Sequence, residues 1–184
     1  NLNDAKIDTK GTYAIYTVGV NDSIDVKLVE GTFVTGKQEE LVRKIKTLAS
    51  GKMRLMISGK DDKGREVKEQ ADFVLFSYAD KRPPYETSKW VVPKTLKFEG
   101  DKPAEILFGT SNRDSYILYR VYNDTKVFEC RFVRLDNENQ KFVIPYRAEF
   151  GDGVNVSYAL VKDGALDETN YLLERVEPTE EKDG

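Results

Sequence analysis

Apolar and polar side chains alternate along most of this chain, and turn-forming residues separate the alternating stretches. In MRLMISGKDDKGREV, which begins at Met53, the apolar residues alternate up to an Asp-Asp-Lys-Gly turn at 61–64. Successive side chains of a β-strand point to opposite faces, so this alternation predicts strands with one buried face. Asp and Gly both tolerate the backbone of a tight turn. The stretch therefore predicts a hairpin of strands 53–60 and 65–76.

The same alternation predicts strands through most of the remaining sequence. The further strands are expected at 12–18, 23–34, 103–109, 114–122, 125–135, 140–145, 153–161 and 165–176. One stretch, 37–51, breaks this rhythm because Leu41, Val42, Ile45 and Leu48 follow helical spacing. It predicts one short amphipathic helix of about three turns.

The strand pattern also predicts which side chains form the core. The inward-facing sets are expected to be Ala104, Ile106 and Phe108 on one strand, and Val154, Val156, Tyr158 and Leu160 on another. Cys130 is the single cysteine and alternates with Phe128 and Phe132, which predicts a buried, inert thiol. A single cysteine allows no internal disulfide and no cysteine-based metal cage.

A polar stretch at 78–90, with Pro83-Pro84 at its centre, interrupts the strand series. Paired prolines favour a stiff, extended spacer, so a domain border is expected there. The sequence predicts an all-β chain of two tandem antiparallel β-sandwiches, at 1–84 and 85–178, with the short helix in the first. Residues 179–184 are expected to form a disordered acidic tail.

The composition argues against several classes of function. The chain has no histidine, which removes the commonest general base, the usual catalytic triads and most zinc sites. Its net charge of -3, with both signs interspersed, argues against a nucleic-acid partner. No apolar stretch approaches the roughly 20 residues of a membrane-spanning helix. The sequence therefore predicts a chain that is not an enzyme and has no nucleic-acid partner and no transmembrane segment.

Acidic turns are the candidates for a metal site, at 61–64, 151–153 and 163–167. None follows the calcium-loop pattern of regularly spaced aspartates with a later glutamate, and Lys63 stands where a ligand would be needed. Each is better explained as turn chemistry. Carboxylate pairs for glycoside hydrolysis are not distinguished among the 32 acidic residues. We therefore predict no catalytic, cofactor-binding or metal-binding residues.

Trp90, the single tryptophan, ends the polar stretch. It could form a sugar-stacking platform or a plug that seals the junction between the two domains, and the second is favoured. Pro83, Pro84 and Trp90 are accordingly the predicted inter-domain junction residues.

Three stretches resemble one protein family. KTLKFEGDKPAEILFGTSNRDSYILYRVYND (94–124) is similar to the opening of a macroglobulin domain in bacterial alpha-2-macroglobulin-like proteins. KFVIPYRAEFGDGVNVSYALVKDGALDETNY (141–171) resembles the end of such a domain, and LASGKMRLMISGKDDKGREVKEQADFVLFSYADKRPP (48–84) resembles a preceding one. The family's Cys-x-Glu-Gln thioester is absent, because Cys130 is followed by Arg-Phe-Val. The resemblance implies macroglobulin domains of the immunoglobulin-like and fibronectin-III-like sandwich type.

The resemblance also implies a role, a location and partners. It implies a non-catalytic structural fragment of an exported bacterial protein of the periplasm, outer membrane or cell surface, serving as a scaffold for protease trapping and inhibition. Its partners would be neighbouring domains of the same parent chain and the proteases that the full-length protein traps, and no cofactor would be needed. The alternative is a cell-surface adhesin or a carbohydrate-binding β-sandwich pair. A cleavable bait at 37–54 is disfavoured because the helical period predicts packed structure.

Overall fold

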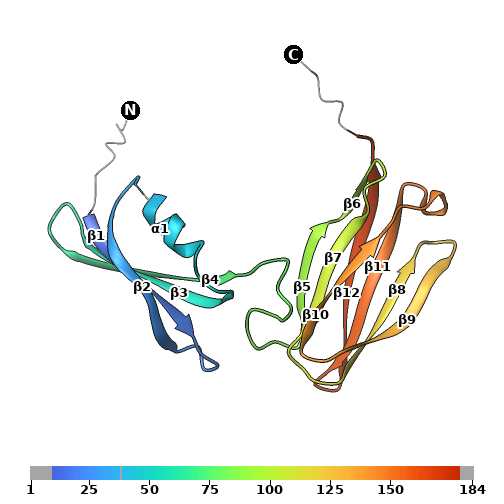
Figure 1. The fold of residues 1–184 in the computed structure, drawn as a ribbon, viewed down its shortest axis with the longest axis horizontal. Helices are drawn as coiled ribbons and strands as arrows, with labels where there is room; N and C mark the ends of the chain where they lie inside the picture. The colour runs from blue at the N-terminus through green and yellow to red at the C-terminus, as the bar shows by residue number, and fades with distance from the viewer. Residues whose placement is uncertain (1–9, 38, 179–184) are drawn as a thin grey trace, which may run out of the picture. The chain divides into compact units, whose positions relative to one another are not determined.

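The computed structural model describes residues 10–37 and 39–178, so the predicted acidic tail at 179–184 lies outside the described residues. In the described chain nearly all regular structure is β-strand, with one short α-helix and one short 3-10 helix (Figure 1). The chain divides into two compact units, Asn1–Ser77 and Tyr78–Gly184. The all-β class and the single short helix of the first unit are thus confirmed. The two units divide between Ser77 and Tyr78, ahead of the expected border at Pro84.

The first unit contains one antiparallel sheet with the strand order β2-β1-β3-β4. Its elements are β1 (Lys10–Val18), β2 (Ile24–Val34), α1 (Glu39–Ile45), β3 (Gly51–Lys60) and β4 (Glu66–Leu75). The sequence predicts a two-sheet sandwich for this unit as well. Over residues 10–37 and 39–77 the structure has a single sheet with α1 against one face, and it is the second unit that has two sheets (Figure 1).

Tyr13 organises the buried face of the first sheet. The core residues Tyr13, Ile15 and Met53 are almost fully buried there. The Lys44 ammonium of α1 lies over the Tyr13 ring, 5.7 Å from its centroid. On β2, Gly31 is paired directly with Tyr13, so the ring crosses a residue that has no side chain. A glycine at this place lets the aromatic ring lie close to the sheet and present its face to the helix.

α1 is shorter than the predicted helix. Its last turn tightens after Ile45, because the N–H groups of Thr47 and Leu48 donate to carbonyls three residues back, at 3.1 and 3.0 Å. This is the 3-10 pattern that is common at helix ends. Gly51, the last residue of the stretch in which the helix was expected, is the first residue of β3.

The second unit is a two-sheet sandwich. The smaller sheet has the order β10-β7-β5, and the larger has the order β6-β12-β11-β8-β9 with β6 parallel to β12. The elements are β5 (Trp90–Thr95), β6 (Lys97–Glu99), β7 (Ala104–Thr110), β8 (Ser115–Tyr122), β9 (Val127–Leu135), β10 (Glu138–Ile144), η1 (Ala148–Phe150), β11 (Gly153–Lys162) and β12 (Ala165–Val176).

The core of the second unit fills the space between its two sheets. Both predicted inward sets are confirmed, since the side chains of Ala104, Ile106, Phe108, Val154, Val156, Tyr158 and Leu160 are all buried. At its centre the Phe108 ring of the smaller sheet stacks on the Tyr158 ring of the larger one, with centroids 4.8 Å apart. Tyr119 and Phe142 complete this aromatic cluster. These rings bury large apolar areas and fix the spacing of the two sheets.

The predicted burial of Cys130 is wrong, and a β-bulge explains why. The pairing of β8 with β9 shifts between Val121 and Tyr122, which leaves Phe128 as the extra residue of β9. An extra residue reverses the alternation of the strand. Phe128 therefore packs against Phe150 of the core, with centroids 4.9 Å apart, whereas Cys130 and Phe132 are exposed.

Candidate functional site

An open groove lies on the face of the first sheet that α1 does not cover. Tyr13 faces α1, so Thr12, Ala14 and Tyr16 point to the other face by strand alternation. The groove on that face has a volume of about 830 Å³ and takes residues from all four strands. This volume falls within the range of small-molecule sites, roughly 300–1,000 Å³.

Strand pairing arranges the side chains of this face in three rows. From β2 to β4 the rows are Thr32, Thr12, Ser58 and Lys68; then Glu30, Ala14, Met56 and Gln70; then Lys27, Tyr16, Arg54 and Asp72. The first row offers hydroxyl groups, which both donate and accept hydrogen bonds. In the second row, the apolar side chains of Ala14 and Met56 lie between the carboxylate of Glu30 and the amide of Gln70. The surface therefore suits a ligand that carries hydroxyl or amide groups.

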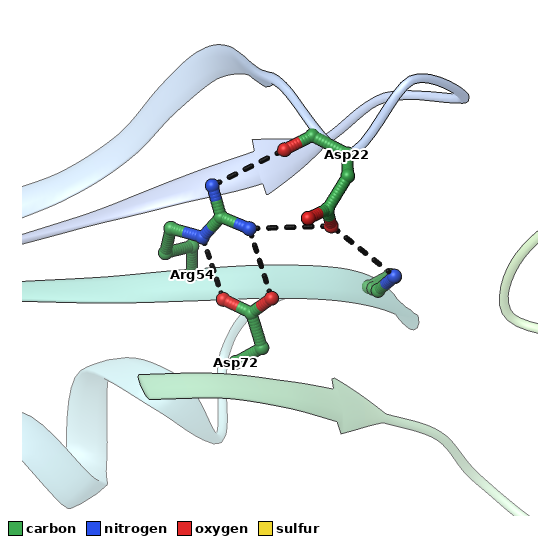
Figure 2. Close-up of polar contacts among 4 residues, drawn as sticks. Asp22, Arg54 and Asp72 are labelled. Carbon is green, nitrogen blue, oxygen red and sulfur yellow. Dashed lines mark hydrogen bonds and ion pairs between the residues drawn. The ribbon is translucent and has the colours of Figure 1, made fainter. Parts of the chain in front are cut away.

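An ion cluster that includes Arg54 and Asp72 of the third row lies at one end of this face. Arg54 donates to both carboxylate oxygens of Asp72, from Nε to Oδ1 at 2.6 Å and from Nη2 to Oδ2 at 2.9 Å. It also donates to Asp22, from Nη1 to the backbone carbonyl and from Nη2 to Oδ1, both at 3.2 Å. Lys52 Nζ lies 3.6 Å from Asp22 Oδ1. Figure 2 shows the guanidinium of Arg54 held between the two aspartates.

The cluster is a structural clamp rather than a proton-transfer site. Hydrogen bonds and charge from Arg54 lower the pKa of Asp72, and Asp72 raises the pKa of Arg54, so both stay ionised at neutral pH. Asp22 adopts a left-handed backbone with φ of 58°, which Asp tolerates better than most residues. Arg54 donates a hydrogen bond to the backbone carbonyl of Asp22 and thereby connects the β1–β2 turn to β3 and β4.

The clamp predicts an acid-dependent loss of stability. Asp72 has a folded-state pKa below its ordinary value of 3.8, so its contribution is fully present above that value and is lost as the pH falls through the lowered pKa. Asp72→Asn is expected to reduce the stability of the first unit at neutral pH. The difference from the unsubstituted chain should shrink toward zero as the pH falls well below 3.8. Urea titrations followed by circular dichroism, from neutral pH to well below pH 3.8, measure this difference in stability. A difference that does not change with pH would contradict the prediction.

The tip of the β3–β4 hairpin is a turn held by Asp61. Its Oδ1 accepts hydrogen bonds from the backbone N–H groups of Lys63 at 2.9 Å and Arg65 at 2.8 Å. Its Oδ2 accepts from Arg65 Nε at 2.7 Å, and Gly64 supplies a φ of 74°. The backbone and side-chain donors lower the pKa of Asp61. The predicted hairpin is thus confirmed, and the carboxylate is occupied by its own turn.

This occupancy predicts a turn without a metal requirement. Asp61→Ala removes the acceptor of three hydrogen bonds and is expected to lower the melting temperature of the first unit. Because Asp61 already serves the turn, adding Ca²⁺ should leave the melting temperature of the unsubstituted chain unchanged. Asp62→Ala, which leaves the Asp61 acceptor in place, is the matched control. A calcium-dependent rise in melting temperature that Asp61→Ala abolishes would show that the turn is a metal site.

The structure places the predicted junction residues within the second unit. The segment that carries Pro83 and Pro84 is tied to that unit on both sides: the Asn139 N–H donates to the Lys81 carbonyl at 2.8 Å, and the Ser111 N–H to the Thr87 carbonyl at 2.7 Å. Trp90 begins β5, and its ring meets Tyr85 edge-on with centroids 5.7 Å apart. The sealing role of these residues stays a prediction.

The ion cluster was not among the predicted site residues. Its members come from a turn and two strands: strand pairing places Arg54 opposite Asp72, and the β1–β2 turn brings Asp22 to Arg54. The available signal was an alternation of polar residues on the face opposite Met53 and Leu55.

Over residues 10–37 and 39–178 no group of three or more acidic, histidine or cysteine side chains is placed to hold a metal ion. The same described ranges contain no helix of the length and apolarity that a membrane span requires. In comparisons with known proteins, the chain matches no protein-family model and no curated protein.

Proposed function

We propose that this chain is a non-catalytic scaffold segment of an exported bacterial protein of the alpha-2-macroglobulin-like type. In this proposal its outer sheet faces pack on neighbouring domains of the same parent chain. Protease trapping is then a property of the parent protein, and the two units hold part of its frame. The resemblance to macroglobulin domains suggests the family. One surface of the second unit supports the scaffold role on physical grounds.

That surface is an exposed apolar patch on the outer face of the larger sheet. It consists of Tyr116, Phe132, Val161 and Leu166, each more than half exposed, and Phe132 reaches 73%. Phe132 pairs with Leu118 across β9 and β8, Leu118 pairs with Ala159 of β11, and Val161 pairs with Leu166 of β12. Exposed apolar side chains that adjoin one another, rather than standing singly, are a feature of interaction surfaces. The patch therefore supports a role in which a neighbouring domain covers the outer face of the larger sheet.

The charged groups near the patch and the phenols of the core support a structural role. Glu168 Oε1 accepts hydrogen bonds from Arg120 Nη2 and Ser157 Oγ, both at 2.8 Å, which ties three strands together. Burial raises the pKa of Tyr119 and of Tyr158, so these phenols stay protonated at neutral pH. These groups are engaged in cross-strand contacts or sequestered in the core rather than gathered in a cleft.

Cys130 gives a direct test of the proposal. Its exposed thiol shares the outer face of β9 with Phe132, two residues away. In the 184-residue chain, a maleimide should label Cys130 rapidly. In the longer protein expressed from the complete reading frame, labelling should slow at least about tenfold, and Phe132→Lys should restore it. Equal labelling rates in the two proteins would overturn the proposal.

A second cysteine controls for general access. Lys63→Cys in a Cys130→Ser background places a thiol at the exposed tip of the β3–β4 hairpin. Its labelling rate should be the same in both proteins. Intact mass spectrometry at timed intervals measures both sites.

Carbohydrate binding is the alternative, and the groove of the first sheet favours it. The hydroxyl row and the Tyr16 ring are the chemistry that recognises a sugar, by hydrogen bonds and by stacking. A glycan array with the whole chain tests this alternative. Specific binding that Tyr16→Ala abolishes, while Tyr116→Ala on the second unit leaves it intact, would favour the carbohydrate-binding function over the scaffold.

A further inference from the structure

Among residues 10–37 and 39–178, β4 is an unpaired sheet edge whose protection against pairing is limited to its charged side chains. It is the last strand in the order β2-β1-β3-β4 and pairs with β3 along its full ten residues without a register shift. Exposed edges are normally blunted by charged side chains, bulges, prolines, short length or covering segments, and β4 has only the first of these. The other described edges have such features: two register shifts in β2, a bulge in β9, Pro93 in β5, three residues in β6 and a covering bond from Lys81 on β10.

The hairpin geometry fixes which backbone groups of β4 point outward. The Asp61 N–H donates to the Arg65 carbonyl at 2.9 Å, so the backbone of Arg65 faces β3. Along an antiparallel strand the facing alternates from one residue to the next. The free N–H and C=O groups therefore belong to Glu66, Lys68, Gln70, Asp72 and Val74. The side chains of these residues lie on the groove face.

The exposed edge is complementary to itself. A two-fold axis perpendicular to the sheet pairs outward-facing residues of one copy with those of another and keeps the two faces matched. With Gln70 opposite Gln70, residues 66–74 of the two copies pair, and Lys68 of each copy faces Asp72 of the other. On the opposite face, Val67 of each copy lies beside Phe73 of the other.

Neighbouring registers lack this complementarity. With Lys68 opposite Lys68, two ammonium groups face each other, and with Lys68 opposite Gln70, Glu66 faces Asp72. Directly opposed like charges destabilise a strand pair, whereas opposite charges and apolar pairs contribute roughly 0.2–1 kcal/mol each. With Gln70 opposite Asp72, Lys68 faces Val74 and no opposite charges meet. Charge complementarity therefore favours the register that is centred on Gln70.

We propose that two copies of the chain associate through antiparallel β4 strands with Gln70 at the two-fold axis. The pairing joins two four-stranded sheets into one continuous sheet and doubles the groove face across the axis. It satisfies the outward N–H and C=O groups of both edges. This association is independent of the scaffold and carbohydrate-binding functions discussed above.

Disulfide trapping in the whole chain tests the register. In a Cys130→Ser background, Gln70→Cys places two thiols on residues whose Cα atoms would be about 5.5 Å apart, within the range that a disulfide spans. Mild oxidation should convert most of the chain to a covalent dimer. Lys68→Cys is the matched control, because its two copies would be offset by four residues, roughly 13 Å, and should not cross-link. Cross-linking at position 68 but not at 70, or at neither, would overturn the proposal.

A proline scan tests the edge without a cross-link. Gln70→Pro removes an outward N–H and leaves the hydrogen bonds to β3 in place, which an edge strand tolerates. The variant should sediment as a monomer with an unchanged circular dichroism spectrum, while Gln70→Thr and the unsubstituted chain should show a concentration-dependent dimer. A monomer at every concentration for the unsubstituted chain would refute the association.

Discussion

Replacing Phe108 by alanine is expected to lower the free energy of unfolding of the second unit by about 3–5 kcal/mol. Phe108 is 0% exposed, and its ring stacks on Tyr158 between the two sheets. Truncation removes this contact and leaves a cavity that the flanking strands cannot close, because both are fixed by their sheets. A loss of this size is a large part of the roughly 5–15 kcal/mol that stabilises a typical domain.

The chain provides its own reporter and control for this experiment. Trp90 is the single tryptophan and belongs to the second unit, so its fluorescence during urea unfolding reports on that unit. Phe132→Ala makes the same chemical change at a ring that is 73% exposed, and it should alter the free energy by no more than about 0.5 kcal/mol. Equal losses for the two variants would show that the sheets do not enclose the core as described.

The faces of the second unit could be predicted because both of its sheets bury one side. On β11, strict alternation leaves one consistent assignment, and Val154, Val156, Tyr158 and Leu160 are all in the core. The same argument fails on β9, where a bulge at Phe128 reverses the alternation and exposes Cys130. Nothing in a local pattern marks a single extra residue, because a bulge depends on the partner strand.

The first unit shows a second limit of alternation. The pattern identifies a buried face at Tyr13 and Ile15 but does not say whether a sheet or a helix covers it, and here the cover includes α1. At Ile24, Val26 and Leu28 the apolar period is present, yet all three side chains are exposed on an edge strand with two register shifts. Period two thus predicts a strand, whereas burial depends on the neighbours of that strand.

The candidate site was harder to predict because its residues are joined only by register. Arg54 and Asp72 lie opposite each other on β3 and β4, and Asp22 reaches them from a turn. Each is an unremarkable charged residue within its own stretch of sequence. The pairing of β3 with β4 brings Arg54 and Asp72 together, and Asp22 joins them from its turn. The alternation predicts that strands pair, but it does not predict which residues lie opposite each other.

Gly31→Ala is expected to destabilise the first unit by about 1–3 kcal/mol through overpacking. A methyl group on Gly31 would lie 2.7 Å from the hydroxyl oxygen Oη of Tyr13 and 2.9 Å from Cζ, the ring carbon that carries this hydroxyl. The ring cannot swing away freely, because Lys44 of α1 lies over it. The added methyl group therefore displaces the ring, the ring displaces the helix, and the buried face at Ile15 loses its cover.

The matched control separates this clash from a general effect of replacing glycine. Gly19→Ala, in the turn between β1 and β2, would place its methyl group no closer than 3.7 Å to any neighbour and should be neutral or stabilising by up to about 1 kcal/mol. Adding Tyr13→Phe to Gly31→Ala removes the nearest atom but leaves ring carbons at 2.9 and 3.0 Å, so it should recover only part of the loss. Chemical denaturation followed by circular dichroism, in the transition that Trp90 fluorescence does not report, measures all three variants. A neutral Gly31→Ala would mean that the ring of Tyr13 does not hold the helix to the sheet.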